Sequence, residues 1–142
     1  GTLFIVNDHL DIAILSEADG VHLGQDDVPI AAARSLLPPH MIIGISCSTL
    51  GEAREAARQG ADYLGIGAVI ATPTKEGYPV VGLEGLRRIA DEVPLPIAAI
   101  GGVNLVNMAE MKAAGAKYPA MVREFQEETA ARVAAVNELY SR

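Results

Sequence analysis

At residues 63–70 the chain reads Tyr63-Leu64-Gly65-Ile66-Gly67-Ala68-Val69-Ile70, an apolar run interrupted only by glycine, and it turns polar at Ala71-Thr72-Pro73-Thr74-Lys75. A short run of this kind is typical of a strand that is buried on both faces. The loop that follows offers two hydroxyls, Thr72 and Thr74, and one cation, Lys75. Such groups bind phosphate or pyrophosphate at the carboxyl end of a strand, although a solvated surface turn has the same composition.

The same pattern repeats along the whole chain, where apolar runs alternate with segments of helical periodicity. The runs cover residues 3–6, 20–24, 41–45, 63–70 and 97–100. Short connections between them predict five parallel strands with helices outside, as in a βα-barrel or a doubly wound sheet. Thr49 with Glu52 predicts a capping box, Gly60 fits a helix C-cap, and Asn104 is predicted to cap a helix that runs to about residue 114.

Polar residues gather after the apolar runs and not before them. They are Asn7-Asp8, Asp26-Asp27, Ser46, Thr72-Pro73-Thr74-Lys75 and Gly101-Gly102. The carboxyl ends of parallel strands share one face of a sheet, where active sites are built. The sequence therefore places carboxylates suited to a divalent ion near hydroxyls, a lysine and glycine N–H groups suited to phosphate.

Bulk composition narrows the class of protein. A chain of 142 residues with 50% hydrophobic content fits one domain with a sizeable core. Its net charge of -7 disfavours a nucleic-acid partner. No stretch reaches the roughly 18 apolar residues of a membrane span, and we find no signal peptide, so we expect a cytoplasmic protein. The single cysteine, Cys47, excludes an intramolecular disulfide and is interpreted as a packing residue.

Six motifs lie in order across residues 3–116. They are Phe4-Ile5-Val6-Asn7-Asp8 with its continuation to residue 13, Ala18-Asp19-Gly20-Val21-His22-Leu23-Gly24-Gln25-Asp26-Asp27, Gly44-Ile45-Ser46, Gly60-Ala61-Asp62-Tyr63-Leu64-Gly65-Ile66-Gly67, Thr72-Pro73-Thr74-Lys75 and Ala99-Ile100-Gly101-Gly102-Val103. Together they resemble the thiamine phosphate synthase family. The resemblance implies a TIM-barrel (βα)8 fold, here as a partial barrel of about five parallel strands. It also implies a transferase that joins hydroxymethylpyrimidine pyrophosphate to thiazole phosphate, releases pyrophosphate and uses Mg²⁺.

The resemblance assigns roles to individual residues. Asp8 and Asp27 match the family's Mg²⁺ carboxylates, and two carboxylates plus substrate oxygens suit this hard ion. Asn7 matches a residue that contacts the pyrimidine substrate. Ser46 matches a serine near the pyrophosphate leaving group.

The phosphate-binding groups follow from the same resemblance. Thr72, Thr74 and Lys75 match the loop that holds phosphate and leaving group, and Gly102 matches a glycine whose backbone N–H faces the thiazole phosphate. Lys75 and Ser46 are the expected catalytic residues. The family's reaction is dissociative: pyrophosphate leaves first, and the thiazole nitrogen then attacks the pyrimidine carbocation.

Three further polar residues receive structural interpretations. His22 lies in mid-strand, and we expect a hydrogen-bonded core histidine. Asp26 is expected to be solvated or to cap a turn, with Asp27 as the metal ligand. Gln25 either caps a turn or contacts substrate.

The chain departs from the family pattern at both ends. The family begins with two more βα units, the second of which carries a Gln-x-Arg-x-Lys pattern, whereas this chain begins at the third strand. After residue 116 the family continues with an eighth strand, where this chain has Lys117-Tyr118-Pro119. We therefore divide the chain into a partial barrel, residues 1–116, and a tail, residues 117–142. The tail is predicted to be one amphipathic helix from about Ala120 to Tyr140, with an apolar stripe. The stripe consists of Met121, Val122, Phe125, Val133, Val136 and Tyr140.

Two other functions stay open at this point. One is a non-catalytic α/β domain that binds phosphate or another protein, and the other is a thiazole tautomerase-like protein. The Thr72-Pro73-Thr74-Lys75 loop favours a synthase over a tautomerase, while the missing Gln-x-Arg-x-Lys segment favours a non-catalytic role. Open strand edges and an amphipathic helix also predict a homo-oligomer.

Overall fold

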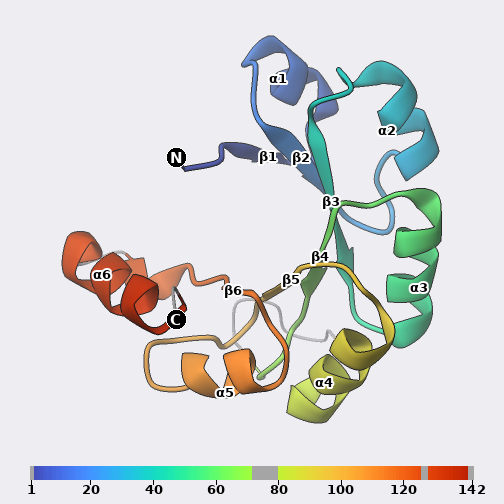
Figure 1. Cartoon of the computed structure of the whole chain (residues 1–142). Coiled ribbons are helices and arrows are strands. Elements are labelled where there is room, and N and C mark those ends of the chain that lie inside the picture. Colours follow the sequence, from blue (N-terminus) through green and yellow to red (C-terminus); the bar gives the residue numbers. More distant parts are fainter. Residues whose placement is uncertain (1, 72–79, 126–127, 141–142) are drawn as a thin grey trace.

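A computed structural model describes residues 2–71, 80–125 and 128–140 of the chain. Its centre is a parallel sheet of six strands whose spatial order, β1-β2-β3-β4-β5-β6, follows the sequence. The strands are β1 (Ile5–Asn7), β2 (Gly20–Leu23), β3 (Ile42–Cys47), β4 (Tyr63–Ile66), β5 (Ile97–Ala99) and β6 (Tyr118–Pro119). The sheet curves into a half-barrel, seen in Figure 1.

The helices that connect the strands lie on the outer side of this curve (Figure 1). They are α1 (Leu10–Leu15), α2 (Ile30–Leu36), α3 (Leu50–Gln59), α4 (Gly82–Glu92) and α5 (Met108–Ala113). Two further elements follow β6, the 3₁₀ helix η2 (Arg123–Phe125) and α6 (Thr129–Tyr140). The predicted parallel strands with helices packed outside are confirmed, and the strands lie next to one another in sequence order.

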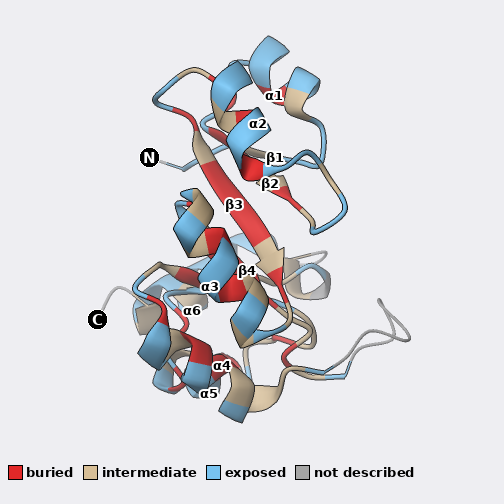
Figure 2. Ribbon diagram, turned by 90° about the vertical axis from the view of Figure 1, so that its right-hand side faces the viewer, coloured by how far each residue is buried: buried red, intermediate tan, exposed pale blue. Residues whose placement is uncertain are grey.

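The two faces of the sheet differ in chemistry because successive side chains of a strand point to opposite faces. Val21, Ile43 and Leu64 expose no surface and belong to the main hydrophobic core. The core also includes Ala53 of α3 and Leu86 of α4, so this is the face that the helices cover. Figure 2 shows the buried residues concentrated along the central strands. Burial of each such aliphatic side chain contributes about 1.5–3 kcal/mol.

Helix α3 has the N-cap and the C-cap that the sequence predicts, but the Glu52 side chain binds a different residue from the one expected. The Oγ1 atom of Thr49 accepts a hydrogen bond from the Glu52 amide at 3.2 Å, and Gly60 ends the helix at a φ of 91°. The Glu52 carboxylate accepts from the amide of Ser48 at 2.7 Å, so Ser48 takes the place that the capping box gave to Thr49.

The sixth strand was not predicted. Where the sequence suggested an interruption, Tyr118 and Pro119 pair with Ala98 and Ala99 of β5. The flanking residues secure the pairing, because the Lys117 amide donates to the Ile97 carbonyl at 2.9 Å. Proline removes one ladder donor, which an edge strand tolerates. The parallel sheet therefore continues past residue 116.

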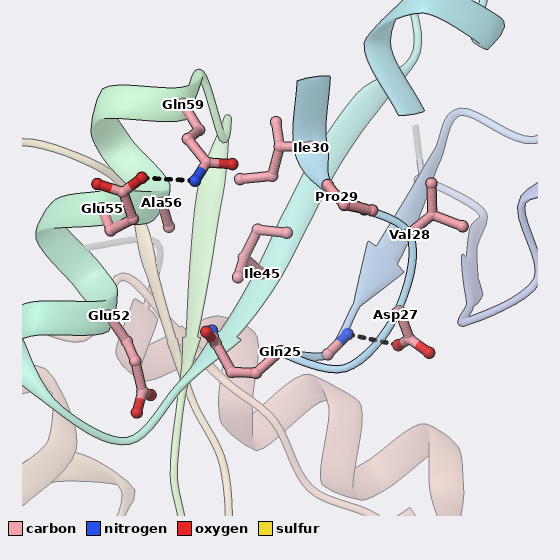
Figure 3. Close-up of a pocket in the computed structure, with 11 residues that line it drawn as sticks. Gln25, Asp27, Val28, Pro29, Ile30, Ile45, Glu52, Glu55, Ala56 and Gln59 are labelled. Carbon is pink, nitrogen blue, oxygen red and sulfur yellow. Dashed lines mark hydrogen bonds between the residues drawn. The ribbon is translucent and has the colours of Figure 1, made fainter. Parts of the chain in front are cut away.

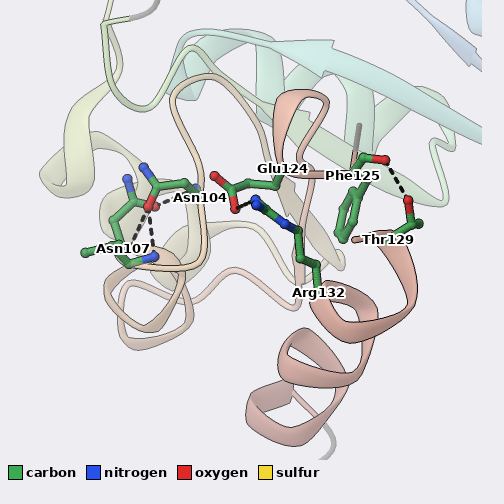
Figure 4. A network of polar contacts seen from close by, with 7 residues as sticks. Asn104, Asn107, Glu124, Phe125, Thr129 and Arg132 are labelled. Atoms are coloured by element: carbon green, nitrogen blue, oxygen red, sulfur yellow. Dashed lines mark hydrogen bonds and ion pairs between the residues drawn. The ribbon is translucent and has the colours of Figure 1, made fainter. Parts of the chain in front are cut away.

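Helix α5 begins at Met108, and the predicted start at Asn104 is wrong. Asn104 instead closes a turn, because its Oδ1 atom accepts from the amides of Val106 and Asn107 at 2.9 and 3.0 Å. The Asn107 Oδ1 atom accepts from the Asn104 amide in return at 2.9 Å (Figure 4). Asparagine favours turns of this kind for the same reason that it favours helix caps.

The tail is also shorter as a helix than predicted, because α6 begins at Thr129 and not near Ala120. A 3₁₀ turn precedes it, and the Glu124 carboxylate there pairs with Arg132 of α6 at 2.8 Å (Figure 4). The predicted apolar stripe is only partly right. Val136 packs against the core, whereas Val122 and Val133 are 66% and 41% exposed.

Helix α6 docks on α5 of the same chain. The Tyr140 hydroxyl donates to the Met108 carbonyl at 3.0 Å, and the Lys112 ammonium donates to the Leu139 carbonyl at 2.5 Å. The Lys112 Nζ atom also lies 5.5 Å from the centre of the Tyr140 ring. Within the described residues no helix is both long enough and apolar enough to cross a membrane.

Candidate active site at the strand ends

Strand register brings Asn7, His22, Gly44 and Tyr63 into one row across the sheet. Asn7 of β1 pairs with His22 of β2, His22 with Gly44 of β3, and Gly44 with Tyr63 of β4. Residues in register on parallel strands point to the same face. This row alternates with the core residues, so it lies on the inner face of the half-barrel, away from the helices.

A hydrogen-bonded chain links three strands on this inner face. The Nδ1 atom of His22 lies 2.8 Å from the Tyr63 hydroxyl, and its Nε2 atom lies 2.9 Å from the Ser46 Oγ atom. The expectation of a hydrogen-bonded histidine is therefore confirmed, and Tyr63 and Ser46 are among its partners. The expectation of a core position is wrong, because His22 is half-buried on the inner face and lies outside the hydrophobic core. Ser46, which is half-buried and is expected near a leaving group, is the last residue of this series of hydrogen bonds.

Two glycines make room for the rings. A Cβ atom added at Gly44 would overlap the ring of Tyr63. One added at Gly65 would lie 2.8 Å from the Cε1 atom of His22. Gly65 therefore permits close packing within the sheet, because the ring of His22 lies against it. Tyr63 thus lies over β3, and His22 reaches across β3 towards β4.

Asp8 and Asp27 follow the neighbouring strands β1 and β2. The exposed Asp8 has a φ of 64°, and its amide donates to the His22 carbonyl at 2.8 Å. The Oδ2 atom of the half-buried Asp27 accepts from the Gly24 amide at 2.7 Å, which closes the β2–α2 loop. Asp27, and not Asp26, therefore caps this turn. Asp26 is exposed, as predicted.

The donor set fits Mg²⁺. Carboxylate oxygens from two adjacent strand ends are the hard ligands that Mg²⁺ prefers, with waters and substrate oxygens completing its coordination. Among the described residues no group of three or more histidine, cysteine or acidic residues could hold a metal ion by itself. A Mg²⁺ site here therefore needs oxygens beyond these side chains, which a pyrophosphate would supply.

Gln25 ties the β2–α2 loop to the end of β3. Its Nε2 atom donates to the Ser46 carbonyl at 2.6 Å, so the side chain fixes the backbone of the serine. The contact joins two strand ends and does not cap the loop's own turn, which Asp27 closes.

A hollow of about 260 Å³ opens beside Gln25, between this loop and α3 (Figure 3). Its carboxylates are Asp27, Glu52 and Glu55. Hydrogen bonds from Arg58, and then from Gln59, lower the pKa of Glu55 to about 2. Because negative side chains line the hollow, it is a poor site for a phosphate group.

The Gly101-Gly102 turn after β5 meets the chain that leaves β4. Both glycines have positive φ, 87° and 70°. The Ile70 amide donates to the Gly101 carbonyl at 3.0 Å, and a Cβ atom at Gly102 would lie 2.7 Å from the Ile70 Cβ atom. Asn107 secures the turn by donating from Nδ2 to the Gly102 carbonyl at 2.9 Å. Glycine is required here both for its backbone angle and for this close approach.

The predicted phosphate loop itself, with Thr72, Thr74 and Lys75, lies outside the described residues.

Cys47 is described and is buried. Burial, with a smaller contribution from Glu52, raises the pKa of its thiol to about 12. A protonated, buried thiol is not a nucleophile, which supports the packing interpretation.

Sequence reasoning did not single out Tyr63 or Gly44. Their signal was present, because a tyrosine in one strand and a glycine in the neighbouring strand suit a ring lying across the sheet. Using that signal required the register, which places Gly44 opposite Tyr63.

Comparison with known proteins gives a consistent result. The family model for thiamine monophosphate synthase matches residues 1–125. The chain is 46% identical over 145 residues to the thiamine-phosphate synthase of Pelotomaculum thermopropionicum, which covers 100% of this chain and 66% of that protein. It is 54% identical over 118 residues to the enzyme of the same name from Moorella thermoacetica, which covers 82% of this chain and 56% of that protein. The chain thus spans less than two thirds of either relative.

A solved structure agrees with these sequence matches. The thiamine phosphate pyrophosphorylase from Pyrococcus furiosus superposes with a TM-score of 0.88 at 39% identity. The superposition covers 99% of this chain and 68% of that one. The half-barrel is therefore a large part of the same fold.

Proposed function

The chain belongs to the thiamine monophosphate synthase family, and we propose that it forms the catalytic strand ends of a thiamine-phosphate synthase. The reaction would join hydroxymethylpyrimidine pyrophosphate to thiazole phosphate and release pyrophosphate. The observation that carries this proposal is the placing of Asn7, Asp8, Asp27 and Ser46 at the carboxyl ends of three adjacent strands or in the loops that follow them.

The pyrimidine pyrophosphate would lie against β1 to β3. Asn7 would contact the pyrimidine from the inner face, and Ser46 would stand near the leaving pyrophosphate. Asp8 and Asp27 would hold Mg²⁺ together with pyrophosphate oxygens. When bound, Mg²⁺ would neutralise negative charge on the leaving group.

The thiazole phosphate would lie nearer to β4 and β5. The Gly102 N–H would face the phosphate, and the fixed turn of Gly101 and Gly102 prearranges that donor. Thr72, Thr74 and Lys75 would complete the anion site. Lys75 and Ser46 are the residues that we propose to stabilise the departing charge. No side-chain nucleophile is needed, which agrees with the buried, protonated Cys47.

The relatives favour this proposal over its alternatives. The family model and the similar proteins named above all carry the synthase or pyrophosphorylase name, and none is named as a tautomerase or as a binding module. A cytoplasmic location and a homo-oligomeric state are further parts of the proposal. The exposed apolar residues Leu3 and Phe4, which precede β1, are a surface that such self-association could cover.

The test is product formation by the purified protein with both substrates and Mg²⁺, measured as thiamine phosphate by chromatography. We expect product with the wild type, strong loss with Asp27→Asn, and near-wild-type rates with Asp26→Asn, because Asp26 is the exposed neighbour. Equal rates for these two variants would contradict the metal assignment. No product, beside an active relative as positive control, would contradict the proposed function.

A further inference from the structure

The chain of hydrogen bonds from Tyr63 through His22 to Ser46 has a direction. A neutral imidazole has one N–H donor and one acceptor nitrogen, so the contact at one nitrogen determines what the other can do. Either Tyr63 donates to Nδ1 and Nε2–H donates to Ser46, or Ser46 donates to Nε2 and Nδ1–H donates to Tyr63.

The chemistry of the phenol favours the first direction. A phenolic O–H is a stronger donor than an imidazole N–H, and a neutral imidazole nitrogen is a good acceptor. Burial raises the pKa of Tyr63 to about 12, so its proton stays in place. Within the described part of the chain, the hydrogen bond of the Tyr63 hydroxyl is with His22.

We propose that Tyr63 and His22 are positioning residues that set Ser46 as a hydrogen-bond donor to the substrate. With Tyr63 donating to Nδ1, the Nε2–H group donates to the Ser46 Oγ atom. The serine's own proton is then directed away from the histidine, towards an acceptor oxygen of the bound pyrophosphate. A serine that instead donated to His22 would present only lone pairs to an anion.

The surrounding residues hold this geometry. Gln25 fixes the Ser46 carbonyl at 2.6 Å, and Gly44 and Gly65 leave the space in which both rings lie. The ring centres of His22 and Tyr63 are 5.4 Å apart with a 39° angle between the planes. The role in catalysis rests on the proposed function, whereas the direction of the hydrogen bonds does not.

The direction of the hydrogen bonds from Tyr63 through His22 to Ser46 is tested first, in a measurement that needs no substrate. Protein labelled with ¹⁵N in its three histidines would be measured by NMR at about pH 8, where imidazole is neutral. His22→Gln identifies the His22 signals. We expect the wild-type proton on Nε2, and a mixture of the two tautomers in Tyr63→Phe. A wild-type proton on Nδ1 would overturn the proposal, whatever the enzyme activity.

The positioning role is tested by a double-mutant cycle in the product assay. Loss of one hydrogen bond predicts that Tyr63→Phe lowers kcat about tenfold with little change in KM. In a Ser46→Ala background the same substitution should change kcat less than about twofold, because its effect passes through the serine. His22→Gln, which keeps an amide donor near the Nε2 position, should retain more activity than His22→Leu. Equal effects of Tyr63→Phe in both backgrounds would overturn the role.

These two measurements separate the possible failures. If the wild-type protein forms no product, the proposed function fails while the NMR result still decides the direction. If product forms and the tautomer is as expected, only the cycle decides whether Tyr63 acts through Ser46. Melting temperatures of all variants show whether a lowered kcat comes from misfolding.

Discussion

The Nε2 atom of His22 lies 2.9 Å from the Oγ atom of Ser46, although the two residues are 24 positions apart. They belong to the neighbouring strands β2 and β3, and both point to the inner face of the half-barrel. Tyr63 of β4 contacts the opposite nitrogen of the same ring at 2.8 Å. A polar chain across three central strands thus leads to a residue that the family resemblance places near the leaving group.

Gly44→Ala should destabilise the fold, because the added Cβ would overlap the ring of Tyr63. Overpacking of this kind costs about 1–3 kcal/mol. Gly51→Ala in α3 is the matched control, since a Cβ there has no neighbour closer than 3.9 Å. We expect the control to be neutral or to stabilise by roughly 0.5–1 kcal/mol through helix propensity. Urea unfolding of both variants measures the difference, and equal free energies would contradict the packing described for Tyr63.

Asp27→Asn should affect both folding and ligand binding. The hydrogen bond from the Gly24 amide becomes weaker without the charge, which should lower the free energy of unfolding by about 1 kcal/mol. Binding of Mg²⁺ with pyrophosphate, measured by calorimetry, should weaken for Asp27→Asn and for Asp8→Asn. Asp26→Asn should change neither quantity. Unchanged affinity in Asp8→Asn and Asp27→Asn would refute the carboxylate pair as the metal site.

Lys75→Ala should weaken pyrophosphate binding by roughly 1.5–3 kcal/mol, the scale of a charge-assisted hydrogen bond. Thr72→Val should weaken it less, because a hydroxyl donor carries no charge. Lys117→Ala is the control for net charge, since Lys117 is an exposed lysine before β6. Calorimetry at low salt measures the pyrophosphate affinity of the three variants. If Lys75→Ala bound pyrophosphate as tightly as the control, the loop would be a solvated surface turn and not an anion site.

The Cys47 thiol should be protected from alkylation in the native protein. Its pKa, raised to about 12 by burial and by Glu52, leaves very little thiolate at about pH 8. We expect labelling by a thiol reagent to be at least about 100-fold slower in the native than in the urea-unfolded protein. Rapid labelling of the folded chain would show that the thiol is accessible and ionised.

Val136→Ala should lower the free energy of unfolding by about 1 kcal/mol, because Val136 packs against the core from α6. Val133→Ala, on the same helix, should cost less than half as much, since Val133 is 41% exposed. Thermal or urea unfolding of the pair is the measurement. Similar values for the two would mean that α6 does not dock on α5 in solution.

The sequence was sufficient to predict β1 to β5, because continuous apolar runs and short connections admit few arrangements. It was insufficient for β6, which has two residues, one of them proline, and an exposed Tyr118. Such an edge strand is defined by backbone pairing with Ala98 and Ala99, and no apolar run marks it. The start of α6 was missed for a related reason, because the periodicity continues through the 3₁₀ turn that precedes it.

The candidate site also has a part that the sequence could predict and a part that it could not. Asp8, Asp27 and Ser46 could be predicted because each lies at or beyond the end of an apolar run in the sequence, and no contact between strands is needed to find it. The contacts of His22 could not, because they depend on the register of β2, β3 and β4. Tyr63 lies 41 positions from His22, so no local pattern could join them.

The most direct test of the account is a ³¹P NMR time course of the purified protein with hydroxymethylpyrimidine pyrophosphate, thiazole phosphate and Mg²⁺. Inorganic pyrophosphate and thiamine phosphate should appear in equal amounts, and only when both substrates are present. Release of pyrophosphate without thiamine phosphate, or an unchanged spectrum beside an active relative, would contradict it.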